Sequence, residues 1–454
     1  MMNKEKNIQE IINHLKSAGF VFQGSEIYGG LANTWDYGPL GSLLAKNLKD
    51  FWWKEFIIKE PNNFAVDTKI LMNPKVWEAS GHVANFSDPL IENKLNNKRY
   101  RADHIVEQLF PEIDIKNMSN LDLENFIKEN VKEYDNSKTD WSSIRQFHLM
   151  FETQQGVVVD KKDLIYLRPE TAQGIFVNFK NVQRATRAKL PFGVGQIGKS
   201  FRNEVTPGNF IFRTREFEQM ELEIFSYPEQ SFDIYKKYLE KVWNFLLKLG
   251  IKEKSIRLRE HQKEELAHYS QATSDIEFLF PFGWGELLGV AHRGDFDLKS
   301  HMLHSKENLE YLDPETNKKI IPHVIEPSIG MDRLLLALIV DSYENEKLEN
   351  DDTRIVLKLN KELAPYKVAI LPLVKKLSKN ADDIFQFLVN NNISATYDET
   401  GSIGKRYRRQ DSFGTFYCIT VDYETLNDNK ITIRNRDTMK QERIDIDQIL
   451  NYIK

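Results

Sequence analysis

The stretch GVGQIGKSFRNEVTPGNFIFRTREFEQMELEIF, residues 193–225, decides the fold. It consists of two extended runs, and Pro207-Gly208-Asn209 between them is typical of a turn. The stretch therefore predicts a long β-hairpin.

The two faces of this hairpin differ, because successive side chains of a strand point to opposite sides. On the second run the face expected to meet a core carries Met220, Leu222 and Ile224. The opposite face carries Arg213, Arg215, Phe217 and Glu221. On the first run Arg202 and Glu204 share a face. This surface offers cations for phosphates, an aromatic plate for a base and carboxylates for amines.

Residues 193–200 also match two nucleotide-binding patterns, GxxxxGK[ST] and GxGxxG. Both patterns need a strand before the glycines and a helix after them, because the helix N-terminus holds the phosphates. Pro191 stands just before the glycines, and Pro207 follows too soon for a helix of useful length. The context argues against a phosphate loop, although residues 334–341 imitate an apolar strand that ends in a magnesium-binding aspartate.

Composition limits the class of protein. A chain of 454 residues allows two or three domains, and 41% hydrophobic with 28% charged residues is typical of a globular protein. The net charge of −5 means that any nucleic acid must meet a local basic patch. The single cysteine, Cys418, excludes a disulfide framework and a cysteine-cluster zinc site within one chain. There is no signal-peptide pattern and no apolar run near the ~20 residues of a membrane span, so we expect a cytoplasmic protein.

The chain divides into two expected domains. The first covers residues 1–350, with a polar, helical insertion at about 92–146 and a second insertion at about 297–322. The run ENEKLENDD at 344–352 predicts a solvated boundary. Beyond it, helices alternate with short apolar strands, which predicts an α/β domain over residues 360–454.

Two further segments allow more than one interpretation. From Gly41 onward an aromatic and aliphatic stripe recurs at helical spacing, which suits either a dimer interface or plain core packing. The stripe consists of Leu44, Leu48, Phe51, Trp52 and Phe56. The segment EPSIGMDR at 326–333 ends a strand and opens an apolar helix, which places Arg333 in the first helical turn at a sheet edge. A functional role and a plain helix-surface position fit Arg333 equally well.

Together these segments resemble the three signature motifs of class II aminoacyl-tRNA synthetases. Motif 1 corresponds to the helix that ends near Trp53, with its proline near Pro39; motif 2 to FRNE (201–204), the turn and FRTREF (212–217); motif 3 to GMDR (330–333). Longer phrases narrow the resemblance to glycyl-tRNA synthetases of the dimeric type. These phrases are GSEIYGGLANTWDYGPLG, SGH (80–82), YRAD (100–103), LRPETAQGIF (167–176), FEQMELE (217–223), WGELLGVAHR (284–293) and EPSIG.

The resemblance covers almost the whole chain and implies an α+β fold. An antiparallel-sheet catalytic domain with helical insertions would precede an α/β anticodon-binding domain. The implied protein is a homodimer, not associated with membranes, that activates glycine with ATP and Mg²⁺ and transfers it to the 3′-terminal adenosine of tRNA(Gly).

The resemblance also implies an ATP site with Arg202, Arg333 and Glu286 as catalytic residues. Arg202 would bridge the glycine carboxylate and the α-phosphate, and Arg213 and Arg333 would hold the distal phosphates. Phe217 and Arg333 would enclose adenine, Glu204 would take its amino group, and Glu286 would bind Mg²⁺. The implied ATP-binding residues are Arg202, Asn203, Glu204, Phe212, Arg213, Phe217, Glu286, Leu287, Gly330 and Arg333.

By the same resemblance, the amino-acid pocket holds Arg101, Glu170, Glu221, Glu326 and Ser328. A glycine site has no substrate side chain to hold, so it must bind the ammonium firmly and exclude any Cβ atom by crowding. Several carboxylates around one ammonium meet the first requirement.

In the last domain, Tyr407 stands within a basic cluster, which the resemblance assigns to tRNA: Lys405, Arg406, Arg408 and Arg409. A solvated helix face fits the same residues. Some members of the family carry a Cys pair before YRAD, whereas residues 92–98 here are ENKLNNK, so no zinc is expected. Leu288 stands where a polar residue is frequent, which leaves the contacts beside Glu286 open.

Two alternatives remain at the level of the sequence. One is a non-catalytic dimer of the same fold that binds tRNA or serves a polymerase, which should lack the charge-neutralising arginines. The other is a class II synthetase for a different small amino acid. The sequence KLSK at 376–379 imitates a class I motif without its upstream partner and is set aside.

Overall fold

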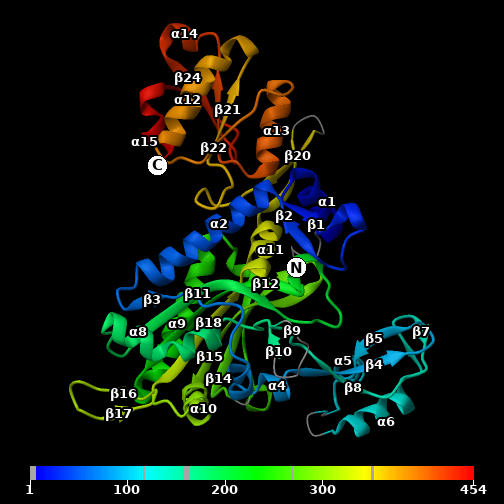
Figure 1. Cartoon of the computed structure of the whole chain (residues 1–454). Coiled ribbons are helices and arrows are strands. Elements are labelled where there is room, and N and C mark those ends of the chain that lie inside the picture. The colour runs from blue at the N-terminus through cyan, green and yellow to red at the C-terminus, as the bar shows by residue number, and fades with distance from the viewer. Residues whose placement is uncertain are drawn as a thin grey trace.

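A seven-stranded sheet forms the centre of the larger domain (Figure 1). The computed structural model describes residues 7–113, 115, 118–156, 164–267, 269–348 and 352–453. The strand order is β13-β14-β15-β18-β12-β11-β3, and only β11 and β3 pair in parallel. The strands are β3 (Asn63–Ala65), β11 (Phe192–Phe201), β12 (Glu216–Ser226), β13 (Ile256–Glu260), β14 (Ala272–Phe280), β15 (Gly283–Gly294) and β18 (His323–Gly330). This mainly antiparallel sheet agrees with the predicted α+β class.

The predicted hairpin consists of β11 and β12, which pair from Phe192 with Phe225 to Phe201 with Glu216. The glycine-rich residues 193–200 lie inside β11, and the strand does not lead directly into an α-helix, so they form no phosphate loop. The connection is longer than a simple turn and contains the 3₁₀ helix η5 (Phe210–Phe212). Arg213 and Arg215 therefore precede β12, and their predicted place on a regular strand face is wrong.

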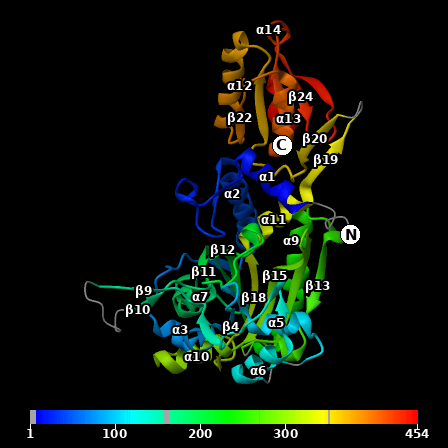
Figure 2. The same ribbon diagram turned by 90° about the vertical axis from the view of Figure 1, so that its right-hand side faces the viewer.

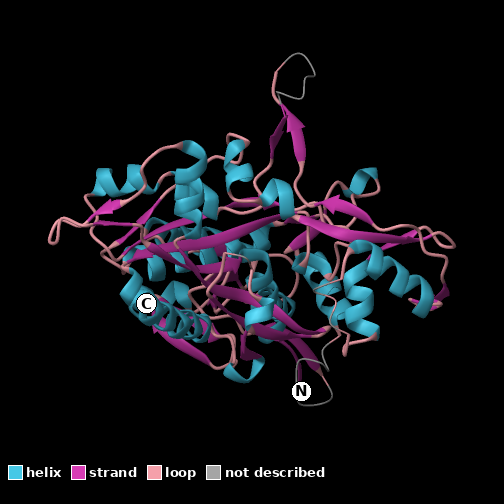
Figure 3. Cartoon of the chain, turned by 90° about the horizontal axis from the view of Figure 1, so that it is seen from below, coloured by secondary structure: helices cyan, strands magenta, loops and turns pink. Residues whose placement is uncertain are grey.

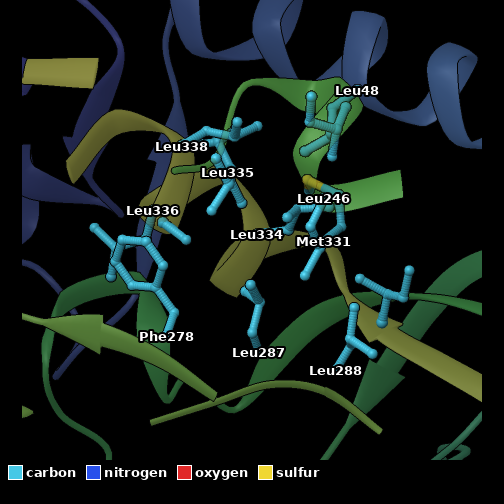
Figure 4. Packing of buried hydrophobic residues seen from close by; sticks show 14 of the residues in the cluster. Leu48, Leu246, Phe278, Leu287, Leu288, Met331, Leu334, Leu335, Leu336 and Leu338 are labelled. Carbon is cyan, nitrogen blue, oxygen red and sulfur yellow. The ribbon is translucent and has the colours of Figure 1, made fainter. Parts of the chain in front are cut away.

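Four helices cover the apolar face of the sheet: α1 (Ile8–Ala18), α2 (Pro39–Trp53), α9 (Ser231–Leu249) and α11 (Met331–Ser342). Met220, Leu222 and Ile224 face this layer and are buried, as predicted. Figure 4 shows the leucines of α11 between Leu48 of α2 and Phe278 of the sheet. A helix that is apolar all round must be buried, and α11 is the centre of this core.

The stripe on α2 belongs to the same core. Leu44, Leu48, Trp52 and Phe56 are at most 1% exposed, and Phe51 is partly buried against them. Of the two interpretations of the stripe, core packing within the chain accounts for these side chains. Pro39 is the first residue of α2, where its missing N–H costs no helical hydrogen bond.

The opposite face of the sheet is only partly covered. Helices α7 (Ala172–Val177), α8 (Phe179–Thr186) and α10 (Phe296–Ser305) pack a second apolar cluster onto its far end. This cluster contains Phe192, Val194 and Phe225 of the hairpin. Near Glu221 and Ser328 the same face is polar, which leaves room for a site.

The insertion predicted at about 92–146 contains a sheet as well as helices. Strands β4 (Ser87–Asn93), β5 (Lys98–Arg101) and β8 (Arg145–His148) form this sheet beside α5 (Ala102–Leu109) and α6 (Asn120–Asn130). They enclose a separate apolar cluster around Ile105 and Trp141. Figures 1 and 3 show this lobe at one side of the large domain.

Short elements make up the remainder of the large domain. They are β1 (Val21–Gln23), β2 (Trp35–Tyr37), α3 (Lys75–Ala79), α4 (His82–Asn85), β6 (Glu133–Tyr134), β7 (Ser137–Lys138), β9 (Glu152–Gln154), β10 (Leu164–Tyr166), β16 (Tyr311–Leu312) and β17 (Lys319–Ile320). The second predicted insertion, 297–322, covers most of α10 together with the β16–β17 pair. Across the described residues, no helix is both long enough and apolar enough to cross a bilayer.

The C-terminal domain has its own sheet and core (Figure 2). Strand order is β22-β21-β23-β24-β25, and helices α12 and α13 flank the sheet. The elements are β21 (Val368–Pro372), α12 (Ser378–Asn390), β22 (Ala395–Tyr397), α13 (Ile403–Phe413), β23 (Tyr417–Val421), α14 (Thr425–Asp428), β24 (Lys430–Asn435), β25 (Gln441–Asp445) and α15 (Ile449–Ile453).

The junction between the domains differs from the predicted solvated linker. Strands β19 (Tyr343–Lys347) and β20 (Thr353–Leu357) pair across it, while residues 349–351 lie outside the described residues. Leu357, Leu359 and Leu363 are at most 2% exposed and belong to the core of the large domain. The large domain therefore extends beyond residue 350, to about Pro365.

Candidate active site

A cavity opens on the polar face of the sheet, beside the start of α11. All the residues predicted to contact ATP line it except Asn203, whose backbone N–H donates to the Leu149 carbonyl at 2.7 Å. The complete lining is Arg202, Glu204, Ile211, Phe212, Arg213, Thr214, Phe217, Gln219, Glu286, Leu287, Ser328, Gly330, Asp332 and Arg333. The fold thus brings motif 2, motif 3 and the Glu286 strand to one place.

Arg202 stands just beyond the end of β11 and is held from three sides. Its Nε donates to the Pro169 carbonyl at 3.1 Å. Its guanidinium lies over the rings of Phe86 and Phe217, 5.6 and 5.3 Å from their centroids. These contacts leave guanidinium nitrogens free to point into the cavity, in a region where Glu221 and Glu286 feel its charge.

Arg333 occupies the first turn of α11, as predicted, and its side chain crosses the cavity. It lies 4.4 Å from the Phe212 ring centroid and donates from Nε to the Phe212 carbonyl at 3.2 Å. Its Nη1 is 3.0 Å from the Glu286 carboxylate. Although enclosure in the cavity opposes it, the charge and hydrogen bond of Arg333 lower the pKa of Glu286. Anionic phosphates that bind Arg333 would therefore compete with Glu286.

Asp332 holds this turn in place, a role that the sequence did not reveal. Its carboxylate accepts hydrogen bonds from the Glu218 backbone N–H at 2.8 Å and from the Tyr37 hydroxyl. Burial raises the pKa of Asp332 to about 6. The contacts tie α11 to β12 and to the segment before α2, and so position Arg333.

Glu286 fits the predicted Mg²⁺ role in one respect. It presents a half-exposed carboxylate to the cavity between Arg202 and Arg333. Within the described residues, no group of three or more His, Cys, Asp or Glu side chains is arranged to hold a metal ion. A single carboxylate suits Mg²⁺ that is shared with substrate phosphates, not a cage made of protein ligands alone. Leu288 is buried in the apolar core and lines no part of the cavity.

Beside this cavity, predicted glycine-binding residues form a buried acidic group. Glu221 accepts hydrogen bonds from the Thr171 backbone N–H at 3.0 Å, the Thr171 hydroxyl, Gln219 Nε2 at 2.8 Å and Ser328 Oγ at 2.8 Å. A carboxylate has about four acceptor sites, so these donors fill them. An ammonium that binds Glu221 would have to displace one of them, and the Ser328 hydroxyl can rotate away.

Glu170 and Glu326 have different partners. Glu170 accepts from Gln173 Nε2 at 2.9 Å and lies 3.4 Å from His82 Nε2. Against the effect of burial, the charge and hydrogen bond of His82 lower the pKa of Glu170. Glu326 accepts from Arg293 Nη1 at 2.9 Å, yet burial raises its pKa to about 8. The region therefore combines a carboxyl group whose pKa is lowered, Glu170, with one whose pKa is raised, Glu326.

Arg293 is the main cation of this acidic group, and the sequence prediction missed it. It also donates to Asp297 from Nε and Nη2, at 2.7 and 2.8 Å, and lies 3.9 Å from the Tyr269 ring centroid. Arg293 belongs to the phrase WGELLGVAHR, which was a sequence signal for the family. Its role as the partner of two buried carboxylates becomes visible only in the tertiary structure. Arg101 forms ion pairs with Asp88 at 3.2 Å and Asp103 at 2.5 Å in the lobe, and the structure does not bring it to the three glutamates.

In the C-terminal domain, the predicted tRNA-binding cluster lies on α13. Lys405 is exposed, while Arg408 and Arg409 are partly exposed and pair with Asp352 at 2.7 Å and Asp398 at 2.6 Å. Arg406 is 3% exposed and donates to the Pro372 carbonyl at 2.7 Å, so its assignment to an RNA surface is wrong. The Tyr407 hydroxyl bonds Thr420 Oγ1 at 2.6 Å on the sheet, and its ring packs there instead of facing solvent.

Known families match both domains. Residues 151–343 match the tRNA synthetase class II core domain (G, H, P, S and T), and residues 367–454 match the anticodon binding domain. The sheet, the arginine-lined cavity and these matches define a class II aminoacyl-tRNA synthetase.

Proteins that are similar over the full length identify the family more narrowly. A glycine–tRNA ligase of Mycoplasmopsis synoviae is 62% identical over 100% of both chains. Those of Mycoplasma capricolum subsp. capricolum and Clostridium acetobutylicum are 57% and 55% identical, over 99% and 100% of this chain and 98% and 99% of theirs. The chain belongs to the glycine–tRNA ligase family.

Proposed function

We propose that this protein activates glycine with ATP to glycyl-adenylate and then transfers glycine to the 3′-terminal adenosine of tRNA(Gly). The observation that carries the proposal is the arrangement of charge. A cavity lined by Arg202, Arg213 and Arg333 adjoins a buried group of carboxylates. The arginine-lined cavity suits a triphosphate, and the group of carboxylates suits a small molecule with an ammonium group.

In the first step, a carboxylate oxygen of glycine attacks the α-phosphorus of ATP, and the bond to the β-phosphate oxygen breaks to release pyrophosphate. The barrier comes mainly from bringing several negative charges together, so positioning and preorganised positive charge supply the catalysis. Arg202 would touch both reacting groups, while Arg213 and Arg333 would hold the distal phosphates. Mg²⁺ held by Glu286 and the phosphates would add further neutralisation.

The nucleoside would lie between Phe217 and Arg333, with its amino group at Glu204. Phe217 already faces the guanidinium of Arg202 in the structure, as expected for an aromatic side chain in a cationic cavity. Phe212, Leu287 and Gly330 would complete the walls. In the second step, a ribose hydroxyl of the terminal adenosine attacks the glycyl carbonyl carbon and AMP leaves.

The ammonium of glycine would bind between Glu170, Glu221 and Glu326. Ser328 would turn from Glu221 toward the substrate, which makes room at Glu221 for an N–H donor. In the C-terminal domain, Lys405, Arg408 and Arg409 are the cations available to the anticodon arm. A homodimer located in the cytoplasm belongs to the same proposal, on the strength of the family.

The alternative of a non-catalytic tRNA-binding dimer is disfavoured because the three charge-neutralising arginines are present and all line one cavity. The decisive experiment is ATP–pyrophosphate exchange measured with each of the twenty amino acids. We expect strong exchange with glycine and almost none with alanine or serine. Better exchange with alanine, serine, threonine or proline would contradict the proposal.

A further inference from the structure

One carboxyl group beside the amino-acid pocket is so far without a role. Glu223 follows Glu221 by two residues on β12, so both point to the same side of the sheet. Its side chain is completely buried. Among the residues that the structure describes, no donor forms a hydrogen bond with either of its oxygens.

The strand register sets Glu223 opposite Glu326. Strand β12 pairs with β18 so that Glu221 faces Ser328 and Ile224 faces Ile325, and the same count puts Glu223 across from Glu326. Residues directly opposite each other on paired strands have Cβ atoms about 4.5–5.5 Å apart, so the two carboxyl groups are within reach of a hydrogen bond. Two ionised carboxylates cannot form such a bond, because both are acceptors only, and two like charges buried side by side repel each other. A proton on one of them removes this repulsion and supplies the donor.

The surroundings favour Glu223 as the carrier. The charged groups that act on it are Glu221 from its own strand, Glu326 from β18 and Arg293 from β15. Arg293 already gives its hydrogen bonds to Asp297 and Glu326, so it leaves Glu223 without a direct cation. An ion buried without a partner costs several kcal/mol, so the neutral form prevails there. In agreement, burial and the charge of Glu326 raise the pKa of Glu223 well above its usual range.

We propose that Glu223 is a positioning residue of the amino-acid pocket, whose neutral carboxyl group donates its O–H hydrogen to Glu326 and so holds that carboxylate toward the substrate ammonium. Arg293 fixes Glu326 from one side and Glu223 from the other, which leaves the remaining lone pairs of Glu326 to the substrate. The neutral state also limits repulsion within the acidic group. This inference rests on the proposed binding of glycine at Glu326.

The test compares Glu223→Gln with Glu223→Met in ATP–pyrophosphate exchange. Glutamine is neutral and keeps an N–H donor for Glu326, so the KM for glycine should stay within about threefold of wild type. Methionine has similar length but no donor, and the KM for glycine should rise about 10- to 100-fold, as expected for a lost hydrogen bond to a charged group. The KM for ATP should change less than about threefold in both. Glu216→Gln, an exposed residue at the start of the same strand, is the matched control and should leave all values unchanged.

Two outcomes would overturn the proposal. If glutamine raises the KM for glycine as much as methionine does, the site needs the negative charge of Glu223. If methionine leaves that KM unchanged in a folded protein, Glu223 only fills space.

Infrared spectroscopy tests the proton directly, even if the methionine variant fails to fold. The difference between wild type and Glu223→Gln should contain the carbonyl band of a protonated carboxylic acid, and its absence would overturn the proposal. This measurement does not depend on which amino acid is activated, so failure of the proposed function is separately visible as wild-type protein that does not exchange with glycine.

Discussion

Replacement of Arg202 by alanine should separate the loss of catalysis from the loss of stability. In the folded protein Arg202 makes one hydrogen bond to a backbone carbonyl and stacks on two aromatic rings. A hydrogen bond contributes about 1 kcal/mol and each cation–π contact about 0.5–1 kcal/mol, so the variant should lose about 2–3 kcal/mol of stability. A domain with a core of this size should tolerate that loss.

The loss of transition-state stabilisation should affect activity more than the loss of folding stability does. Removing one preorganised donor to developing charge costs about 2.7–4 kcal/mol, which is a 10²–10³-fold slower reaction. Arg213 and Arg333 remain in the cavity, so the phosphates keep two cations and activity should not vanish. Arg202→Lys should recover only part of the rate, because an ammonium cannot bridge two oxyanions with a planar fork.

The assay is ATP–pyrophosphate exchange with glycine, with thermal unfolding measured on the same samples. Arg215→Ala is the matched control, since Arg215 is a neighbouring arginine that does not line the cavity. It should exchange at close to the wild-type rate. An Arg202→Ala protein that is well folded and exchanges pyrophosphate within a fewfold of wild type would refute the reasoning.

Four further predictions concern specificity, domains, pH and metals. Glu221→Ala should reduce exchange with glycine about 10- to 100-fold and narrow its lead over alanine, since it removes a charged acceptor and opens space; an unchanged ratio between the two amino acids would count against this role. A chain ending at Pro365 should still form glycyl-adenylate but charge tRNA poorly, and undiminished charging would remove the anticodon role of the last domain. A chain ending at Asn350 lacks three buried leucines of the core, and the burial of each contributes about 1.5–3 kcal/mol to stability. This shorter chain should therefore not fold stably. Because burial raises the pKa of Glu326 to about 8, Glu326 of the free protein gains a proton of its own at lower pH, in addition to the one on Glu223, and an ammonium favours the ionised carboxylate. Binding should then release a proton, and the KM for glycine should fall as the pH rises from about 6 to about 8; a flat or rising KM would contradict this. Purified protein should contain no stoichiometric zinc, given the single cysteine Cys418, while activity should require Mg²⁺; one zinc per chain that is lost together with activity on chelation would be the opposite result.

Local patterns predicted much of this molecule. The turn at Pro207 and the alternation along residues 216–225 predicted the hairpin and its buried face, because the two-residue period of a strand is independent of the surrounding fold. The resemblance carried by this stretch, by GMDR and by the phrase around Glu286 predicted most residues of the cavity lining, but not Ile211, Thr214, Gln219 or Asp332. Where the chain leaves regular structure, this reasoning failed, and Arg213 and Arg215 lie on a loop that obeys no such period.

Partners that are distant in the sequence were decided only by the tertiary structure. The register between β12 and β18 sets Glu223 against Glu326, and packing buries Arg293 between Asp297 and Glu326. No single segment contains these pairs, and a charged residue alone does not reveal whether water or another side chain will solvate it. For the same reason Arg406 looked like an RNA contact but caps backbone carbonyls inside its domain. The sequence by itself determined the fold, the family and the residue types of the site, because strand periodicity and motif residues are local. The charge states of these residues depend on burial and pairing, and only the tertiary structure decides which strands and helices meet.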